Sequence, residues 1–297
     1  MDINKSGFVA VVGRPNVGKS TLINALAGEK IAIVSDKPQT TRNRICGIIN
    51  RENIQYIFMD TPGVHTPKSH LGEYMVKVAS DAISDVDVVV MIVAPVPSIG
   101  KAEEEIIKRI SQSKVPAILL INKIDTVEKT EIFPVIETYS TAYNFEAIIP
   151  ISAYKGDGLT LIYEEIDKFI PEGVALFPED MTSDQPEKQM VSEIIREKLL
   201  RLLNHEIPHG IAVEITRFSE RDNGIIDVVA TIYCERESHK GIIIGKKGAM
   251  LKRIGELARN DIERFMGTKV FLETWVKVKE NWRDNDVLIK NFGFDMQ

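Results

Sequence analysis

The eight residues from Gly13 to Ser20 constrain the fold of this chain more than any other stretch. They read Gly-Arg-Pro-Asn-Val-Gly-Lys-Ser, between the apolar run Phe8–Val12 and a helical pattern over Ser20–Ala27. A strand, a glycine-rich turn and a helix in this order are typical of a phosphate-binding loop, whose backbone amides surround phosphate oxygens. The residues predicted to contact phosphate are Gly13, Arg14, Pro15, Asn16, Val17, Gly18, Lys19 and Ser20. Of these, Lys19 is expected to neutralise β- and γ-phosphate charge, and the Ser20 hydroxyl to bind Mg²⁺.

Residues 8–170 alternate short apolar runs with amphipathic stretches. This alternation predicts an α/β domain with a mostly parallel six-stranded sheet and helices on both faces. The expected strands are Phe8–Val12, Ile45–Ile49, Gln55–Met59, Asp87–Val93, Ala117–Ile121 and Ala147–Ile151. The expected helices are Ser20–Ala27, Tyr74–Ser84, Lys101–Ser111, Ile132–Tyr143 and Leu159–Phe169.

The stretch Asn122-Lys-Ile-Asp125 indicates which base the nucleotide carries. A carboxylate at Asp125 accepts hydrogen bonds from guanine N1–H and from the exocyclic amine, and adenine offers neither donor there. We therefore expect GTP to be preferred over ATP. Around the base, Asn122 is expected at the N7 edge and the Lys123 stem against the ring face. The pair Ser152-Ala153 follows the next strand and is predicted to place the Ala153 amide near guanine O6.

Two further segments are candidates for a nucleotide-sensing switch. Asp60-Thr-Pro-Gly63 ends an apolar strand, where Asp60 can hold Mg²⁺ through a water and the Gly63 amide can sense the γ-phosphate. The polar stretch Lys37–Asn43 suits a mobile loop, and its Thr41 is preferred over Thr40 as the hydroxyl that completes the Mg²⁺ shell. The predicted metal ligands are Ser20, Thr41 and Asp60. The predicted switch residues are Gln39, Thr40, Thr41, Arg42, Asp60, Thr61, Pro62, Gly63 and Val64.

Val64 bears on the mechanism of hydrolysis. Many GTPases carry a glutamine at this position, directly after Asp-x-x-Gly, and it orients the attacking water. A valine has no polar group for that task, so hydrolysis must use another arrangement. One hypothesis is that Asn16 and its loop recruit a monovalent cation such as K⁺ in place of an arginine finger. The alternative is that Asn16 only shapes the loop.

The composition changes after residue 170. Residues 171–186 contain three prolines and four acidic residues, which is typical of a linker. The patterns from residue 187 predict a second domain with the order α-β-β-α-α-β. Its expected elements are Glu187–Asn204, Gly210–Phe218, Ile225–Glu235, His239–Ile244, Ala249–Met266 and Thr268–Val278. The expected organisation is thus 1–170, linker 171–186, second domain 187–283, and a tail 284–297. Trp275 and Trp282 of the second domain could stack on bases; Trp275 is expected in the core instead, whereas Trp282 stays undecided.

Gly245-Lys-Lys-Gly248 joins the two later helices of this second domain. A Gly-x-x-Gly turn can approach a nucleic-acid backbone closely, and its lysines can contact phosphates. The surrounding segment 236–283 holds 12 Lys and Arg against 6 Asp and Glu, a net charge of +6 in a chain whose net charge is −6. This favours RNA binding over a plain helix turn. The predicted RNA-binding residues are Ile244, Gly245, Lys246, Lys247, Gly248 and Lys252.

Other classes of function are disfavoured. No stretch approaches the roughly 20 apolar residues of a membrane-spanning helix, and the first residues lack a secretory signal pattern. Cys46 and Cys234 imply neither a disulfide framework nor a metal site. A GTP-consuming metabolic enzyme lacks support, because no paired acid and base, nucleophile or metal cluster lies outside the nucleotide motifs. A GTPase whose C-terminal module binds a protein or a membrane stays as the alternative.

Taken together, these motifs resemble the Era GTPases over nearly the whole chain. The first half is similar to a translation-factor-type GTPase with a hydrophobic residue after Asp-x-x-Gly, and the second to a type II KH domain, a small α+β RNA-binding fold. The motifs that carry the resemblance are Gly-Arg-Pro-Asn-Val-Gly-Lys-Ser, Gln-Thr-Thr-Arg, Asp-Thr-Pro-Gly, Asn-Lys-Ile-Asp and Ile-Gly-Lys-Lys-Gly.

The resemblance implies a GTP-hydrolysing switch that uses Mg²⁺. It also implies binding near the 3′ end of 16S ribosomal RNA and a role in assembly of the 30S subunit. We expect GTP to favour the RNA-binding state, and a monomer in the cytoplasm. Peripheral association with the inner face of the cell membrane is implied only by the resemblance, since the sequence shows no lipidation signal and no strongly basic amphipathic helix.

Overall fold

The computed structural model describes residues 3–63, 67 and 69–294, and it forms two compact units. The first unit comprises residues 1–32, 41–67 and 75–184. The second comprises residues 33–40, 68–74 and 185–297. Two short segments from the first half of the sequence thus belong, by their contacts, with the C-terminal part of the chain. Val64, one of the predicted switch residues, lies outside the described residues.

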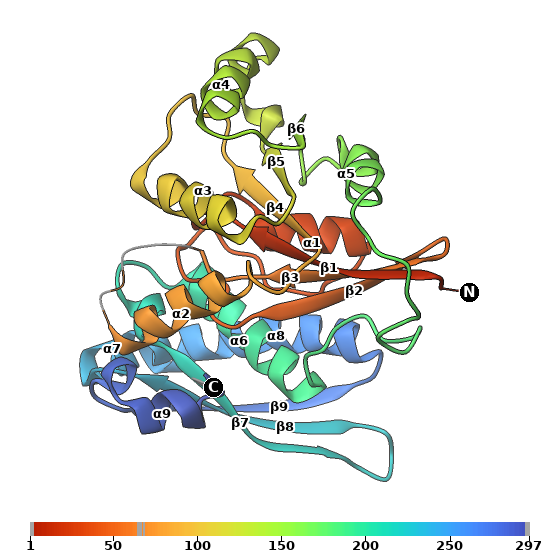
Figure 1. The fold of residues 1–297 in the computed structure, drawn as a ribbon. Coiled ribbons are helices and arrows are strands. Elements are labelled where there is room, and N and C mark those ends of the chain that lie inside the picture. Colours follow the sequence, from red (N-terminus) through yellow and green to blue (C-terminus); the bar gives the residue numbers. More distant parts are fainter. Residues whose placement is uncertain (1–2, 64–66, 68, 295–297) are drawn as a thin grey trace. The chain divides into compact units, whose positions relative to one another are not determined.

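The strands of the first unit form one sheet (Figure 1). Its described members are β1 (Lys5–Val12), β2 (Ile45–Arg51), β3 (Ile54–Asp60), β4 (Val88–Val93), β5 (Ala117–Ile121) and β6 (Ala147–Pro150). They lie in the order β2-β3-β1-β4-β5-β6, with β2 antiparallel to β3 and the other neighbours parallel. The mostly parallel six-stranded sheet expected from the sequence is confirmed.

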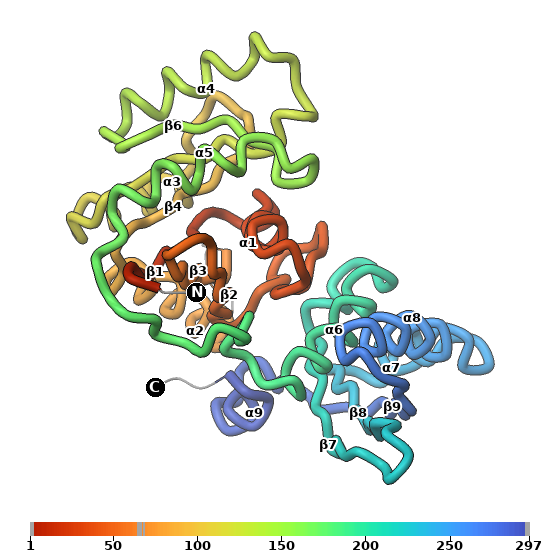
Figure 2. Tube along the Cα trace, turned by 90° about the vertical axis from the view of Figure 1, so that its right-hand side faces the viewer, coloured from red at the N-terminus to blue at the C-terminus, as the bar shows by residue number. Residues whose placement is uncertain are grey.

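Helices cover both faces of this sheet because successive strand residues point to opposite sides. In β1, Val9 and Val11 pack in the layer that contains α1 (Lys19–Ala27) and α5 (Leu159–Ile166). Ala10 and Val12 pack in the opposite layer, with α2 (His70–Asp81), α3 (Lys101–Ser113) and α4 (Lys129–Ala142). Figure 2 shows α1 and α2 on opposite sides of the strands β1–β3. A 3₁₀ turn, Ile124–Thr126, lies between β5 and α4.

The second unit has the predicted order of elements. These are α6 (Glu187–Leu202), β7 (Ala212–Glu220), β8 (Ile226–Cys234), α7 (Glu237–Ile244), α8 (Ala249–Met266) and β9 (Val270–Val278), with 3₁₀ turns at Ile207–Gly210, Lys246–Gly248 and Trp282–Asp284. β8 pairs antiparallel with β7 and parallel with β9, and the helices gather on one side of the strands (Figure 2). Two parallel strands joined through α7 and α8 match the expected type II KH fold.

The two tryptophans differ from expectation. Trp275 was predicted in the core, but on the edge strand β9 its side chain is 56% exposed, so that prediction is wrong. Trp282 is fully buried, and its indole N–H donates to the Gly210 carbonyl at 2.9 Å. The rings of Phe292 and Phe294 pack against it, with centroids 5.3 and 6.3 Å away. Phe292 and Phe294, which pack against this tryptophan, thus come from residues expected to form a tail.

Part of that tail is helical. The short helix α9 (Asp286–Asn291) begins after Asn285, whose side chain accepts a hydrogen bond from the Leu288 amide. The predicted linker is also structured along the first unit: Thr182 accepts from the Ile48 amide at 2.9 Å, and the Asp184 carboxylate from the Cys46 amide at 2.9 Å. None of the described helices combines the length and hydropathy needed to cross a bilayer.

Candidate functional site

The phosphate loop connects β1 directly to α1, as the sequence predicted. Gly18 caps α1 with φ of 108°, and a Cβ atom there would lie 2.3 Å from Nδ2 of Asn122. A side chain at this position would therefore collide with the residue expected at the base. Arg14 points its guanidinium to Glu103 of α3, with Nε 3.1 Å from the carboxylate. Its side chain is thus held by the protein, while its carbonyl faces Lys19.

Lys19 lies buried inside the loop. Its Nζ donates to the carbonyl oxygens of Gly13 and Arg14, each at 3.1 Å. Burial lowers the pKa of this ammonium from 10.5 to about 8, and the nearby Asp60 carboxylate opposes that shift. Carbonyl acceptors hold the cation at the centre of the loop, where phosphate oxygens are expected to bind.

Ser20, Thr41 and Asp60 meet although they come from three different parts of the sequence. Ser20 Oγ lies 2.6 Å from Asp60 Oδ2 and 3.0 Å from Thr41 Oγ1, and Thr41 Oγ1 lies 3.0 Å from the same carboxylate oxygen. The structure therefore brings the three predicted metal ligands together. Thr40 uses its hydroxyl differently, since Oγ1 donates to the Lys37 carbonyl at 2.7 Å. This difference supports the choice of Thr41.

The Asp60 carboxylate fits the expected magnesium. Its Oδ1 atom is buried and has no hydrogen-bond partner among the residues that the structure describes. Burial raises the pKa of Asp60, while Lys19 and the two hydroxyls act in the opposite direction. A buried oxygen without a donor is costly unless a cation or water satisfies it. Two hydroxyls and this carboxylate form the hard oxygen set that Mg²⁺ prefers.

The Asp60–Gly63 segment is fixed against the phosphate loop. Thr61 Oγ1 donates to the Val11 carbonyl at 2.8 Å. Gly63 lies so close to Pro15 that a Cβ atom would be 2.6 Å from its nitrogen. Only glycine permits this approach, which places the Gly63 backbone beside the loop. Pro62, between them, is buried.

Asn122 ties three loops together. Its Nδ2 donates to the Val17 carbonyl at 2.8 Å, and its Oδ1 accepts from the Ala153 amide at 2.9 Å. The Ala153 amide, predicted near guanine O6, is thus used inside the protein. Lys123 Nζ donates to the Asn16 carbonyl at 2.7 Å, so its stem lies along the loop. Both Asn16 and Lys123 have left-handed backbone angles, with φ of 64° and 67°.

Asp125 is exposed and oriented by a buried neighbour. Ser152 Oγ donates to Asp125 Oδ1 at 2.6 Å and accepts from the Lys155 amide at 3.1 Å. Ser152 is fully buried, so a rigid group holds one oxygen of the exposed Asp125 carboxylate. Ser152, predicted only as part of the Ser152-Ala153 pair, therefore acts by orienting the Asp125 carboxylate.

The predicted RNA-binding residues form the turn between α7 and α8. Gly245, Lys247 and Gly248 have positive φ angles of 73°, 52° and 80°. A Cβ atom on Gly245 would lie 2.7 Å from Met250, whereas one on Gly248 would meet nothing within 4 Å. Lys246, Lys247 and Lys252 are exposed, while Ile244 is half-buried beside the turn.

A hollow of about 540 Å³ opens beside this turn, between α8 and β9. Gly248 and Lys252, both predicted, line it. The residues that the sequence analysis missed are Leu251, Gly255, Glu256, Arg259, Val270, Phe271, Leu272 and Thr274. The helical members recur every three or four positions after Gly248, a stripe that periodicity could have revealed. The strand members depend on the pairing of β9, which no local pattern shows.

Known families match both units. The family described as 50S ribosome-binding GTPase matches residues 8–123, and the KH domain family matches residues 206–283. GTPase Era of Ruminiclostridium cellulolyticum is 54% identical over 290 residues, covering 98% of this chain and 97% of the relative. GTPase Era of Clostridium kluyveri is 51% identical, covering 98% and 99%.

Solved Era structures have the same fold. A crystal structure of Era with MgGDPNP and nucleotides 1506–1542 of 16S ribosomal RNA matches with a TM-score of 0.95 and 40% identity, over 99% of this chain and 100% of that chain. A variant of Aquifex aeolicus Era bound to GDP·AlF₄⁻ matches with the same TM-score and identity, over 98% and 100%. With these relatives and the geometry of both sites, the chain belongs to the GTPase Era family.

Proposed function

We propose that this chain is a GTP-hydrolysing switch that binds 16S ribosomal RNA near its 3′ end during assembly of the 30S subunit. The observation that carries the RNA-binding part is the lysine-bearing turn at Gly245–Gly248, which opens into the hollow between α8 and β9. The Era structure that holds both a GTP analogue and a 16S fragment supports it.

In the nucleotide site we assign each group by its position. Lys19, Ser20 and the amides of the loop bind the phosphates; Ser20, Thr41 and Asp60 hold Mg²⁺, which supplies positive charge against phosphate oxygens. The Gly63 amide senses the γ-phosphate, and Asp125 with Asn122 and Lys123 recognises guanine. Gln39 and Arg42 are proposed to belong to the nucleotide-sensing switch. The Ala153 amide, proposed for guanine O6, would have to leave the Asn122 Oδ1 atom to which it donates here.

In the RNA site the exposed lysines are proposed to contact phosphates. Gly248 and Gly255 leave the floor of the hollow without side chains, so a nucleic-acid backbone can approach α8 closely. Phe271 of β9 also lines the hollow and is 52% exposed, with the Arg221 guanidinium 5.1 Å from its ring centroid, so a base is proposed to stack on the remaining ring face. The wall and the lysines together suit single-stranded RNA.

Binding of a labelled RNA fragment from the 16S 3′ end tests this proposal. Affinity is measured at fixed salt, with GDP and then with GDPNP. We expect tighter binding with GDPNP, and loss of binding in Lys246→Asp/Lys247→Asp. The matched control is Lys269→Asp/Lys279→Asp, which makes the same charge change at exposed lysines of the same unit.

Two results would count against the proposal. Equal loss in the control would show that net charge alone attracts the RNA. Absence of binding in either nucleotide state would leave a GTPase whose second unit binds a protein or a membrane, the alternative considered from the sequence.

We also propose that a monovalent cation binds near Asn16 and assists hydrolysis in place of a glutamine. The left-handed backbone of Asn16, held by Lys123, supports an unusual loop shape. We expect faster GTP hydrolysis in K⁺ than in Na⁺, and a smaller ratio in Asn16→Ala. Equal rates in the two salts would remove the cation from the mechanism.

The proposed state of the protein is a cytoplasmic monomer that associates peripherally with the inner face of the membrane. This rests on the family resemblance. Sedimentation equilibrium checks the first part, with a single mass near 33.3 kDa expected. Co-sedimentation with anionic vesicles checks the second, and recovery of the protein only in the supernatant would contradict it.

A further inference from the structure

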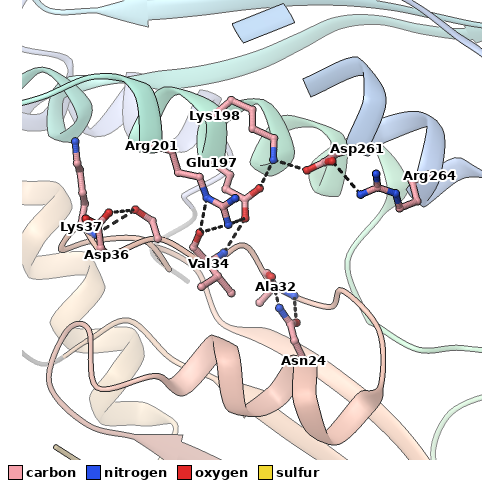
Figure 3. A network of polar contacts seen from close by, with 11 residues as sticks. Asn24, Ala32, Val34, Asp36, Lys37, Glu197, Lys198, Arg201, Asp261 and Arg264 are labelled. Atoms are coloured by element: carbon pink, nitrogen blue, oxygen red, sulfur yellow. Dashed lines mark hydrogen bonds and ion pairs between the residues drawn. The ribbon is translucent and has the colours of Figure 1, made fainter. Parts of the chain in front are cut away.

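The loop that precedes Thr41 is held by a helix of the second unit. Residues 33–40 belong to that unit together with 185–297. Helix α6 contacts the loop through long charged side chains, and Figure 3 shows Glu197 and Arg201 of α6 meeting Val34. Helix α6 of the second unit therefore contacts the backbone of the loop that leads to the predicted switch residue Thr41.

Arg196 makes the contact nearest to Thr41. Its Nη1 donates to the Gln39 carbonyl at 3.3 Å, and its Nη2 donates to the Thr40 carbonyl. On the other side, Nε donates to Glu193 at 2.8 Å and Nη2 forms an ion pair with the same carboxylate. The side chain is only 2% exposed. The guanidinium is therefore committed to two loop carbonyls and one carboxylate.

The start of the loop is held as well. Glu197, 1% exposed, accepts from the Val34 amide and from Arg201 Nη2, each at 3.0 Å. Arg201 donates in turn to the Val34 carbonyl at 2.9 Å. Just before the loop, Asn24 of α1 accepts from the Ala32 amide at 2.9 Å (Figure 3). The loop is therefore held at both ends, at Val34 and at Gln39–Thr40.

Because Arg196 is buried, it stabilises the loop position in which loop carbonyls accept its hydrogen bonds. A buried guanidinium requires acceptors for its donors, and here loop carbonyls supply them. Gln39 also adopts a left-handed conformation, with φ of 60°, which residues other than glycine avoid unless their surroundings impose it. Release of the loop would leave Arg196 without those carbonyls, so α6 favours the position seen here.

We propose that Arg196 is a positioning residue for GTP hydrolysis. The Thr40 carbonyl belongs to the peptide that leads into Thr41, so holding it fixes the direction in which the Thr41 hydroxyl enters the Ser20–Asp60 site. The inference rests on the proposed role of Thr41 as a magnesium ligand. Arg196 is not an arginine finger, because its donors face carbonyls and Glu193 rather than the phosphate loop.

The test compares Arg196→Met and Arg196→Lys with the parent protein. Affinities for GDP and GDPNP are measured with Mg²⁺, together with kcat, KM and Tm. We expect Arg196→Met to weaken GDPNP binding and to lower kcat by about tenfold, within the range of coupling between sites. GDP affinity should change by less than about twofold, because Thr41 is proposed to act only with a γ-phosphate. Arg196→Lys, which can hold one carbonyl, should be intermediate.

Arg283→Met is the matched control. Arg283 belongs to the same unit and makes a similar two-point contact with Glu235, at 3.0 and 2.7 Å. It should lower Tm without changing the ratio of GDPNP to GDP affinity. If Arg196→Met lowers both affinities equally, or neither, Arg196 has only a structural role and the inference is overturned.

Thr41→Ala separates this inference from the proposed function. Loss of GDPNP preference in Thr41→Ala with no loss in either Arg196 variant would overturn the inference alone. No loss in Thr41→Ala would instead overturn the magnesium role of Thr41, and with it the route through Arg196. Should Arg196→Met fail to fold, Arg196→Lys carries the same comparison.

Discussion

A single buried lysine gives the phosphate loop a pH response. Lys19 has a pKa of about 8 in the chain without nucleotide because burial disfavours its charge. Below pH 8 the ammonium is charged in both the folded and the unfolded chain, so its burial lowers the free energy of unfolding. Between about pH 8 and 10.5 the folded chain loses this proton first, and the destabilisation disappears. Bound phosphates favour the ammonium again, so they raise this pKa.

We therefore expect nucleotide binding to take up part of a proton above pH 8, and GDP affinity to fall as pH rises further. Calorimetric titration at pH 8.5 in two buffers of different ionisation enthalpy measures the uptake. Mg²⁺ is left out so that metal binding at Asp60 does not contribute. Lys19→Arg keeps the charge but does not titrate, and an unchanged uptake in that variant would assign the proton to another group.

A single substitution at Asp125 should change the preferred base from guanine to xanthine. Asp125→Asn replaces a double acceptor by an amide that donates, which mismatches guanine and matches xanthine, whose C2 carries an oxygen. We expect GTP affinity to fall about 100-fold or more, since a polar site rejects a base that leaves its groups unpaired. Affinity for xanthosine triphosphate should rise, as competition binding would show.

Asp157→Asn is the control for that change. Asp157 is exposed and pairs with Ser152 through its backbone, and its substitution makes the same loss of charge at a residue with no predicted role in base recognition. Retained GTP preference in Asp125→Asn would contradict the assignment of guanine recognition to this carboxylate.

Among the helices, α8 carries a glycine, Gly255, where it lines the hollow, and this glycine lowers the stability of the helix. Gly255 lies inside this helix, where glycine costs about 0.5–1 kcal/mol relative to alanine. A Cβ atom there would meet nothing within 4 Å, so no packing reason requires glycine. Gly255→Leu should raise the free energy of unfolding while weakening RNA binding roughly tenfold, because the side chain fills the hollow.

Denaturant unfolding and RNA binding measure the two opposite effects. Gly241→Leu is the control, since Gly241 lies within α7, has the same open surroundings and does not line the hollow. If Gly255→Leu stabilises the protein and leaves RNA binding intact, the hollow is not where the RNA backbone lies.

The strands and the phosphate site were predictable because their signals are local. Val9 and Val11 alternate with Ala10 and Val12, and the loop that follows them has a fixed spacing. Helix α9 was missed because it has six residues and depends on aromatic contacts with Trp282. Trp275 was misplaced because it lies on the face of β9 opposite to Val270 and Leu272, which pack in the core. Hydrophobicity alone does not reveal which face of a strand is covered.

The membership of residues 33–40 could not be predicted for a similar reason. Their sequence indicated a polar switch loop, which says nothing of partners more than 150 positions away, as Arg196 is from Thr40. Such a contact forms only within the folded second unit, to which both segments belong. The second unit therefore contains a contact between distant parts of the chain that neither half of the sequence shows by itself.

For the whole molecule, the linkage between nucleotide and RNA must be reciprocal. If GDPNP raises RNA affinity by some factor, RNA raises GDPNP affinity by the same factor. We expect a factor between about 5 and 150 in the parent protein. In Arg196→Met this coupling factor should approach one, because α6 would no longer contact the carbonyls that precede Thr41. RNA affinity with GDP should stay unchanged.

A four-state binding cycle with the labelled 16S fragment measures this factor from both directions. Arg283→Met should keep the parent value, since its ion pair involves Glu235 rather than the loop. A factor that survives in Arg196→Met would mean that RNA and nucleotide communicate by another route, and Arg196 would then act on hydrolysis alone. A factor lost in Arg196→Met and kept in Arg283→Met would place the coupling in the peptide between Thr40 and Thr41, because that peptide joins the loop held by α6 to the hydroxyl beside Asp60.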